Sequence, residues 1–357
     1  MTGKERMQKL LKGEKTDHIG LYEHFWNDTQ KKWAECGWVK ADEPFANIFS
    51  FDMDEFWAFH LVADLDFEPE IVAETEETVT IKDGNGAILR RHKLHDTTPE
   101  HVDYTVKDRE GWEKLIKPKL MPEERRINFE GYAKAKKLCA EKERFFCWSG
   151  VNVFESIHPV CGHENMLVGM ALDPDWIKDM ANTYADLTIK LWKILFEKEG
   201  KPDGIWFYED MGYKLSPFMS PQMYRDLIMP AHIKTIAFAH SLGLPVIMHS
   251  CGFVEPLLPY MVEAGIDCLQ VMEVKAGMDP VRIHKQYGDR LSLMGGIDVR
   301  VLYSNDKSLI DQELEAKIPI LKDGYRFILH SDHSIPENVT YDTYRYFIDR
   351  AMELGQY

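Results

Sequence analysis

From Phe145 onward the chain alternates short apolar segments with longer amphipathic ones, and this pattern constrains the fold more than any other feature. The longer stretches, such as 175–200 and 221–243, have helical spacing of their apolar residues. Strands that alternate with helices in this way form parallel βα units. We predict an α/β fold, a (β/α)8 TIM-type barrel, rather than an open doubly wound sheet, although periodicity alone does not separate the two. The predicted strands are FFCWSG, GIWFYED, PVIMHSCG, DCLQVMEV, LSLMGGID and RFILHSD.

The length of 357 residues fits one such barrel with an N-terminal elaboration. Thr2 is a suitable N-cap for an opening helix, and IGLYEHFW (19–26) has the character of a buried strand. The mixed region at about 27–130 contains VTIKDGNGAILRRH (79–92), which predicts a β-hairpin around its DGNG turn. No linker bounds this region. We therefore predict a single domain, 1–357, with a hairpin-containing insertion at about 27–130.

The charge and the N-terminus narrow the range of partners. With 59 acidic and 43 basic residues the net charge is -16, which disfavours nucleic acid and anionic membranes. No apolar run reaches the ~18 residues needed to span a bilayer. The start MTGKERMQKLLKGEK lacks a signal-peptide core, and the six cysteines form no CxxC pair. We predict a cytoplasmic protein without nucleic-acid or membrane partners; its oligomeric state stays open, with a homodimer among the options.

Polar or reactive residues end nearly every predicted strand. In a barrel these positions converge on one mouth, where catalytic groups collect. Each acid could instead cap the following helix or form a salt bridge at the rim, and Asp298, which precedes VRVLYSN, is a good cap candidate. Glu155 is either buried beside the site or exposed at a helix start. The candidate general acids and bases, or residues that orient ligands, are Asp210, Glu273, Glu155 and Asp298.

His249 and Cys251 form a His-x-Cys pattern at one of these strand ends. Imidazole nitrogen and thiolate sulfur are good zinc ligands, and residues two apart on a strand point to the same side. A catalytic zinc needs about three protein ligands. His333 is the preferred third ligand, with Asp332 and Glu155 as weaker candidates. The structural alternative is a small core cysteine beside a hydrogen-bonded histidine.

Aromatic residues near the start of the chain suggest a flat apolar pocket, although such residues also serve as plain core. His24 lies near the end of the first predicted strand and could face the same mouth. The candidate pocket residues are His24, Trp26, Trp57 and Phe154, with Phe25, Phe56 and Phe59 as further aromatic candidates.

Three segments carry a resemblance to a known family. The stretch from HSCGFVEPLLPYMVEAG to MGGIDVRVL (249–302), SDHSIPENVTYDTYRYFIDRAMELG (331–355) and the opening MTGKERMQKLLKGEKTDHIGL resemble the uroporphyrinogen decarboxylase superfamily. The similarity runs almost continuously from Phe145 to Gly355 and is weak over about 27–130. The superfamily contains tetrapyrrole decarboxylases and zinc- and corrinoid-dependent methyltransferases.

The resemblance favours the methyltransferase branch. The decarboxylases carry an N-terminal arginine-rich motif, whereas the corresponding GLYEHFWNDTQ contains no arginine. The methyltransferases hold zinc with His-x-Cys and a later cysteine; His249 and Cys251 match the first two ligands, and His333 stands at about the third. This departure implies a harder site, better suited to an oxygen ligand than to a thiol.

We therefore expect an enzyme that moves a methyl group from a small methylated substrate to the cobalt of a corrinoid (cobalamin) protein, with zinc assistance. A methoxylated aromatic, and hence O-demethylation, is favoured; methylamines, glycine betaine and thiols stay open. The alternatives are a decarboxylase, for which Arg300 is the nearest strand-end cation, and a non-catalytic corrinoid- or metal-binding barrel.

Overall fold

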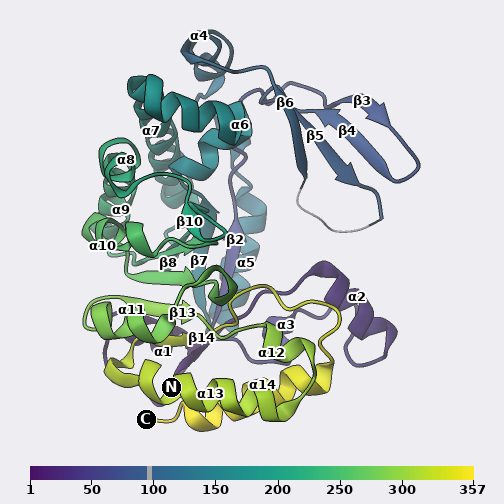
Figure 1. Ribbon diagram of the computed structural model, residues 1–357, viewed down its shortest axis with the longest axis vertical. Coiled ribbons are helices and arrows are strands. Elements are labelled where there is room, and N and C mark those ends of the chain that lie inside the picture. Colours follow the sequence, from purple (N-terminus) through teal and green to yellow (C-terminus); the bar gives the residue numbers. More distant parts are fainter. Residues whose placement is uncertain (95–98) are drawn as a thin grey trace.

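A computed structural model of the protein describes residues 1–94 and 99–357, and its central feature is a sheet of eight parallel strands (Figure 1). Asp52, just before β2, donates its N–H to the carbonyl of Leu21 in β1 at 2.9 Å, which brings the two edges of the sheet together. The result is the (β/α)8 barrel expected from the sequence. Its strands are β1 (Gly20–Leu21), β2 (Met53–Trp57), β7 (Phe145–Val151), β8 (Gly204–Tyr208), β11 (Val246–Ser250), β12 (Cys268–Val271), β13 (Ser292–Gly295) and β14 (Phe327–Leu329).

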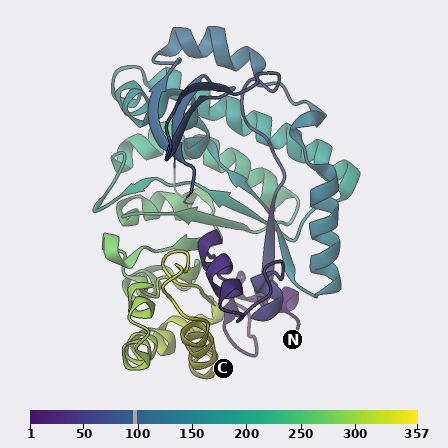
Figure 2. The ribbon, with the colours of Figure 1, turned by 90° about the vertical axis from the view of Figure 1, so that its right-hand side faces the viewer.

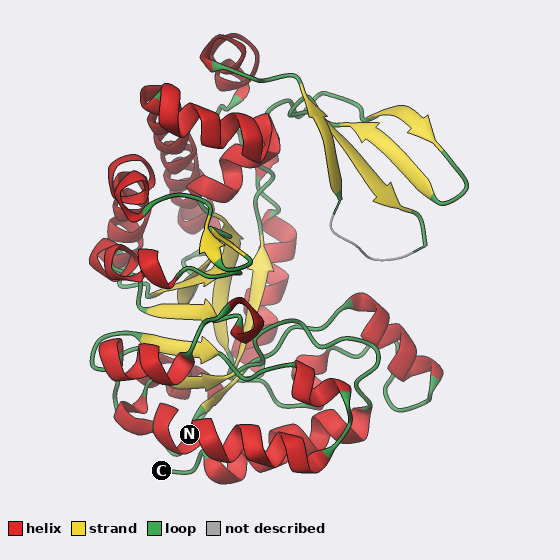
Figure 3. Ribbon diagram, in the orientation of Figure 1, coloured by secondary structure: helices red, strands yellow, loops and turns green. Residues whose placement is uncertain are grey.

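Helices surround the barrel on the outside (Figure 3). The first, α1, begins with a complete capping box, in which Thr2 and Glu5 bond to each other's backbone N–H. The longer helices are α1 (Gly3–Leu10), α2 (Asn27–Glu35), α5 (Phe129–Glu141), α6 (Val153–Leu172), α7 (Pro174–Glu199), α9 (Met229–Ser241), α10 (Leu258–Ala264), α11 (Pro280–Tyr287), α13 (Lys307–Leu321) and α14 (Tyr341–Leu354). Shorter ones are α3 (Phe45–Ile48), α4 (Arg109–Gly111), α8 (Pro221–Met223) and α12 (Arg300–Tyr303).

Large aromatic side chains fill the layer between strands and helices. Trp192 of α7 lies 5.0 Å from the ring of Trp148 in β7 and 5.7 Å from Phe207 in β8. Because successive strand residues point to opposite faces, Trp206 and Tyr208 then point into the barrel. The alternation along β8 thus divides one strand between the outer core and the barrel interior. In Figure 1 the arrows of β8 and β13 point to the right, so the C-terminal ends of these strands lie on that side of the molecule. Figure 2 shows the molecule from that side.

A second sheet of four antiparallel strands stands apart from the barrel strands (Figures 1 and 2). β4 and β5 pair around the Asp83–Gly86 turn, where the sequence predicts a hairpin, and β5 and β6 contact α6. The region at about 27–130 differs from the expectation in one respect: it includes the barrel strand β2, which pairs with β7. That this region belongs to one domain with the barrel stays a prediction. The strands are β3 (Glu70–Glu74), β4 (Thr78–Lys82), β5 (Ala87–His92) and β6 (Glu100–Tyr104).

Within 1–94 and 99–357, no helix combines the length and the apolar character that crossing a bilayer requires.

Candidate functional site

Three side chains with metal-binding atoms meet at the C-terminal ends of two neighbouring strands. Asp210 follows β8, His249 lies in β11 and Cys251 follows β11. One ligand atom from each of these residues lies within 4.8 Å of the other two. His249 Nε2 is 3.2 Å from Cys251 Sγ and 3.2 Å from Asp210 Oδ1. We call these residues the Asp–His–Cys group.

The turn after β11 holds Cys251 against the neighbouring strand end. Asp210 Oδ1 accepts the N–H of Cys251 at 2.7 Å, and Glu273 Oε2 accepts the N–H of Gly252 at 2.8 Å. Gly252 has φ 74°, and a Cβ there would lie 2.5 Å from the carbonyl carbon of Gly212. Only glycine fits this close crossing in a left-handed conformation. The glycine after His-x-Cys therefore shapes the group.

Gln270 of β12 fixes the orientation of the His249 ring. The two residues are register partners, so their side chains point to the same side. The Gln270 side-chain carbonyl accepts a hydrogen bond from His249 Nδ1. This leaves Nε2 as the nitrogen that faces Asp210 and Cys251. A hydrogen bond to the far nitrogen is the usual way in which a metal-binding histidine is oriented.

For two residues of the group, electrostatic interactions with the other members change the pKa more than burial does. Burial lowers the pKa of His249, but Cys251 and Asp210 raise it well above its usual value. Burial raises the pKa of Asp210, but the attraction of His249 brings it below its usual value. Burial raises the pKa of the Cys251 thiol. A bound cation would require the deprotonated forms of His249 Nε2 and of the Cys251 thiol, so its affinity would fall as the pH falls.

A second polar chain crosses the barrel interior beside this group. The Tyr208 hydroxyl donates to Glu55 Oε1 at 2.6 Å, and His24 Nε2 lies 3.0 Å from the same oxygen. His24 Nδ1 lies 3.0 Å from His330 Nε2, which also contacts Gln270 Nε2 at 3.3 Å. The chain thereby reaches Gln270, the residue that orients the ring of the Asp–His–Cys group.

The other acidic strand ends mostly bind backbone N–H groups. Asp298 accepts the N–H of Arg300 and pairs with its guanidinium, which is the structural alternative stated for it above. Asp332, buried, accepts the N–H groups of Val274 and Val299. The Glu273 carboxylate accepts the N–H of Gly252 and lies 3.1 Å from Lys275 Nζ. These three carboxylates shape the loops at the mouth.

His333 and Glu155 lie outside the Asp–His–Cys group. The ring of His333 lies 5.8 Å from that of Trp26. Among the described residues, His333 belongs to no group of three side chains whose ligand atoms all lie within 4.8 Å of one another. Glu155, at the start of α6, has Oε2 at 2.7 Å from His158 Nε2. Within the part of the chain that the structure describes, Asp210 rather than His333 has a ligand atom close to those of His249 and Cys251, and the third metal ligand stays a prediction.

The predicted pocket residues divide between the barrel mouth and the core. Trp57 is 47% exposed and stacks on Tyr208 at 5.8 Å. His24 and Trp26 both line a cavity of about 200 Å³ next to β1. Phe154 is completely buried and packs against Phe218, so the structure makes it a core residue.

A family model described as uroporphyrinogen decarboxylase (URO-D) matches residues 146–354, more than half of the chain. The chain belongs to the uroporphyrinogen decarboxylase family. The resemblance stated from the sequence is thus confirmed. The matched range of this uroporphyrinogen decarboxylase family member contains the whole Asp–His–Cys group, whereas the four-stranded sheet lies outside it.

Two methyltransferases are similar to this uroporphyrinogen decarboxylase family member. A methylated-thiol–coenzyme M methyltransferase of Methanosarcina mazei is 29% identical over 147 residues, 41% of this chain and 37% of that protein. The aligned segment thus spans well under half of the relative. A solved structure of a methyltransferase from Methanosarcina mazei matches 99% of both chains with a TM-score of 0.69 and 17% identity. This second likeness shows that the fold is shared along the chain.

Sequence reasoning missed Glu55, Tyr208, Gln270 and His330. A signal for three of them was present, since they belong to the strand segments GIWFYED, DCLQVMEV and RFILHSD. Alternation of side chains puts His330 on the same side as Asp332 and opposite to His333 if the strand continues to its end. Glu55 lies in the region that the sequence left outside the barrel.

Proposed function

We propose that the protein is a methyltransferase that moves a methyl group from a small methylated substrate to the cobalt of a separate corrinoid protein. The observation that carries this proposal is the Asp–His–Cys group at the C-terminal ends of the barrel strands. The similarity of part of the chain to a methyltransferase favours methyl transfer over decarboxylation. The net charge of -16 and the scattered cysteines suit a cytoplasmic enzyme.

The donor set of the Asp–His–Cys group fits zinc. Carboxylate oxygen, imidazole nitrogen and thiolate sulfur are its common ligands, and catalytic zinc keeps a fourth position open. In this proposal Asp210, His249 and Cys251 hold the ion, which when bound supplies Lewis-acid activation of the leaving atom. A single thiolate beside oxygen and nitrogen donors makes a harder site than a thiolate-rich one. This favours a methyl group carried on oxygen.

An aromatic surface leads from the outside to the Asp–His–Cys group. Trp57, half exposed, stacks on Tyr208, and the ring of Tyr208 lies 5.1 Å from that of His249. Aromatic rings favour offset-stacked or edge-on contacts with one another. We infer that a methoxylated aromatic substrate stacks beside Trp57 and Tyr208 with its ether oxygen toward the group. A methylated thiol is the second candidate, because the partly aligned relative is named for that substrate.

Demethylation of an ether leaves an oxygen that must gain a proton. We infer that His24 and Glu55, 3.0 Å apart, hold this proton, and that the Tyr208 hydroxyl, 2.6 Å from Glu55, passes it to the leaving oxygen. Glu155, a candidate acid in the sequence prediction, is a second proton source in this proposal; its Oε2 lies 2.7 Å from His158 Nε2. In this proposal Glu273 and Asp298 shape the mouth and transfer no proton.

The test combines metal analysis with a panel of methyl donors. The purified protein should contain zinc and should form methylcobalamin from reduced cobalamin with a methoxylated aromatic. The Cys251→Ala change should reduce both the zinc content and the rate of methyl transfer at least tenfold, since it removes one of the three proposed ligands. Cys36→Ala, at an exposed cysteine remote from the barrel interior, is the matched control and should behave as wild type.

Other results would contradict specific parts of the proposal. Normal methyl transfer by Cys251→Ala would dismiss the metal role of the group. If His333→Ala lost more metal than Asp210→Ala, His333 rather than Asp210 would be the third metal ligand. Release of carbon dioxide from an acid without methyl transfer would support a decarboxylase, and the absence of both reactions would support a carrier.

A further inference from the structure

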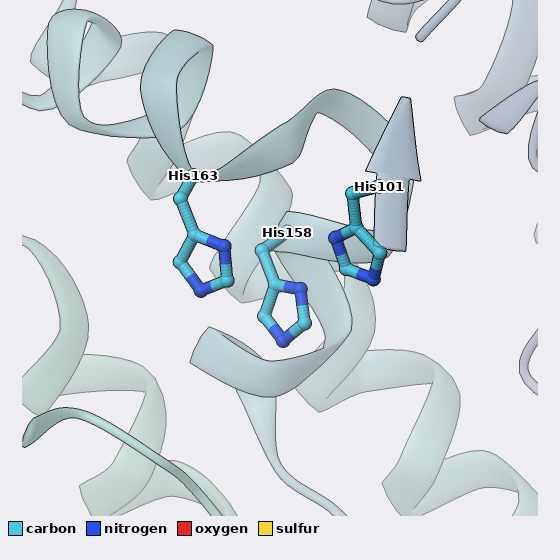
Figure 4. A group of neighbouring side chains, drawn as sticks. All are labelled: His101, His158 and His163. Carbon is cyan, nitrogen blue, oxygen red and sulfur yellow. The ribbon is translucent and has the colours of Figure 1, made fainter. Parts of the chain in front are cut away.

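Three histidines form a second cluster outside the Asp–His–Cys group (Figure 4). His101 lies in β6 of the four-stranded sheet, and His158 and His163 lie in α6. One ring nitrogen from each can be chosen so that all three lie within 4.8 Å of one another. We call these residues the histidine cluster. Neither the family assignment nor the proposed methyl transfer assigns a metal to it.

The rings of the cluster lie against one another in a stack. His158 and His163 have ring centroids 4.3 Å apart, and His101 lies 5.8 Å from His158. Phe218 closes the far side, 4.8 Å from His163. Three imidazolium ions could not share so small a volume. Burial lowers the pKa of His101, and it lowers the pKa of His163 to about 4.

His158 has the hydrogen-bonding pattern of a metal ligand. Its Nε2 lies 2.7 Å from Glu155 Oε2, whereas its Nδ1 is buried and has no hydrogen-bond partner. A buried nitrogen without a partner is costly and rare. A carboxylate on one imidazole nitrogen commonly directs the other nitrogen to a metal. Glu155 therefore presents His158 Nδ1 to the cluster.

A break in α6 brings its two histidines together. Positions five apart in a regular helix differ by about 140° in direction, so His158 and His163 would normally diverge. Gly162 has φ 76° and ψ 159°, which interrupts the helix just before His163. The interruption changes the direction of the following turn and allows the two rings to stack.

A β-bulge directs the third histidine to the same place. In the pairing of β5 with β6, Ile88 faces Asp103 and Leu89 faces His101, so Val102 has no partner. The extra residue in β6 puts the side chains of His101 and Tyr104 on the same face of the four-stranded sheet, with their ring centroids 5.9 Å apart. Two separate backbone irregularities thus converge on one cluster.

We propose that His101, His158 and His163 form a second metal site, which takes zinc or another divalent transition metal and fixes β6 to α6. Three neutral imidazoles suit zinc, cobalt, nickel and copper. The ring planes of neighbouring members lie 18° and 27° apart, so binding turns the rings about their Cβ–Cγ bonds until the lone pairs converge. The site goes beyond the proposed function and does not depend on it.

The test is a titration of the metal-stripped full chain with Co²⁺, followed by its absorption. Wild type should bind two ions per chain. Cys251→Ser should lose the thiolate-to-cobalt band and one ion, whereas His101→Gln should keep that band and lose the other ion. His163→Gln, on the opposite element, should repeat the result of His101→Gln. His60→Gln, at an exposed histidine outside both groups, should bind as wild type.

Thermal unfolding gives an independent readout. In the Cys251→Ser background, saturating Zn²⁺ should raise the unfolding midpoint, because an ion that binds only the folded state stabilises it. The additional His101→Gln or His163→Gln change should abolish that shift. If both histidine variants fold and bind as many Co²⁺ ions as wild type, the proposal is wrong. Absence of methyl transfer would leave this result unaffected, since the readout is binding.

Discussion

Two buried glutamates in the barrel interior differ in pKa although their side chains are identical. Burial raises the pKa of Glu23 to about 8, and Ser331 N–H and Oγ, which bind its carboxylate, offset only part of this effect. Burial acts on Glu55 as well, but His24 and Tyr208 outweigh it and lower the pKa of that carboxyl. The partners of each carboxyl, rather than burial alone, therefore decide which one is ionised at neutral pH.

Glu23 should make the folded state less stable as the pH rises. Its pKa is about 8 in the folded protein against a usual value of 4.5, so the folded state binds its proton more tightly. The stabilisation is complete below about pH 4.5 and is lost as the pH rises toward 8, on the order of 5 kcal/mol. Glu23→Gln cannot ionise and should flatten this part of the curve of unfolding free energy against pH.

Denaturant titrations at several pH values between 5 and 8 measure this effect. Glu337→Gln, at an exposed loop position, is the control and should keep the slope of wild type. An unchanged slope in Glu23→Gln would mean that the carboxyl of Glu23 has the same charge in the folded and the unfolded protein across this range, which would contradict the prediction.

At the scale of the element, the break in α6 links the barrel to the four-stranded sheet. Gly162 is buried where β6 contacts the helix, and the ring of Tyr104 packs directly over it. A regular helix would have neither the gap for Tyr104 nor the stacked pair of His158 and His163. The break is therefore the contact point that β6 uses.

Gly162→Ala should destabilise this contact more than an ordinary glycine substitution would. A Cβ at Gly162 would lie 2.4 Å from Tyr104 Cε2, in a conformation with φ 76°. We expect a loss of about 2–4 kcal/mol in unfolding free energy and faster hydrogen exchange in β6. Gly243→Ala has nearly the same φ, 74°, with no atom within 4 Å of the added Cβ. It should cost about 1 kcal/mol, and equal losses in the two variants would refute the steric argument.

At the scale of the whole molecule, the barrel closes where its first two strands meet. Asp52 Oδ2 accepts the N–H of Leu21 at 2.9 Å, and its other oxygen binds the guanidinium of Arg6. Arg6 also binds Asp17 at 2.8 Å, which ties α1 to the segment before β1. The same end receives the C-terminus, as Tyr357 donates its N–H to Asp17 at 3.2 Å. The two chain ends therefore lie beside the closure of the barrel.

Asp52→Ala should weaken this closure strongly, because it leaves the buried Arg6 without one of its two carboxylate partners and the Leu21 N–H unpaired. We expect a loss of about 3 kcal/mol in unfolding free energy, measured by denaturant titration. Asp349→Ala removes an exposed carboxylate 3.5 Å from Arg345 and should cost less than about 1 kcal/mol. A similar small loss in both variants would show that Asp52 does not hold the barrel closed.

The sequence by itself determined the alternation of strands and helices, because the period of apolar residues changes between the two and is a local property. The closure of the sheet into a barrel depends on a contact between distant segments, that of Asp52 with Leu21. The sequence also determined the pair His249 and Cys251, since two positions on one strand end must share a side. Tertiary structure decided which third residue joins them. That choice depends on register and on the turn at Gly252, and it brought Asp210, instead of His333, to within reach.

Tertiary structure also decided every relation between distant segments. β2 enters the barrel from a region that lacks the helix–strand rhythm, and Phe154 is buried where it packs against Phe218, more than 60 positions later in the sequence. The histidine cluster joins His101 to a helix more than 50 positions later in the sequence. A bulge and a helix break, each visible only in three dimensions, direct these side chains to one place. Local periodicity fixes which elements form, whereas irregularities within them fix which side chains meet.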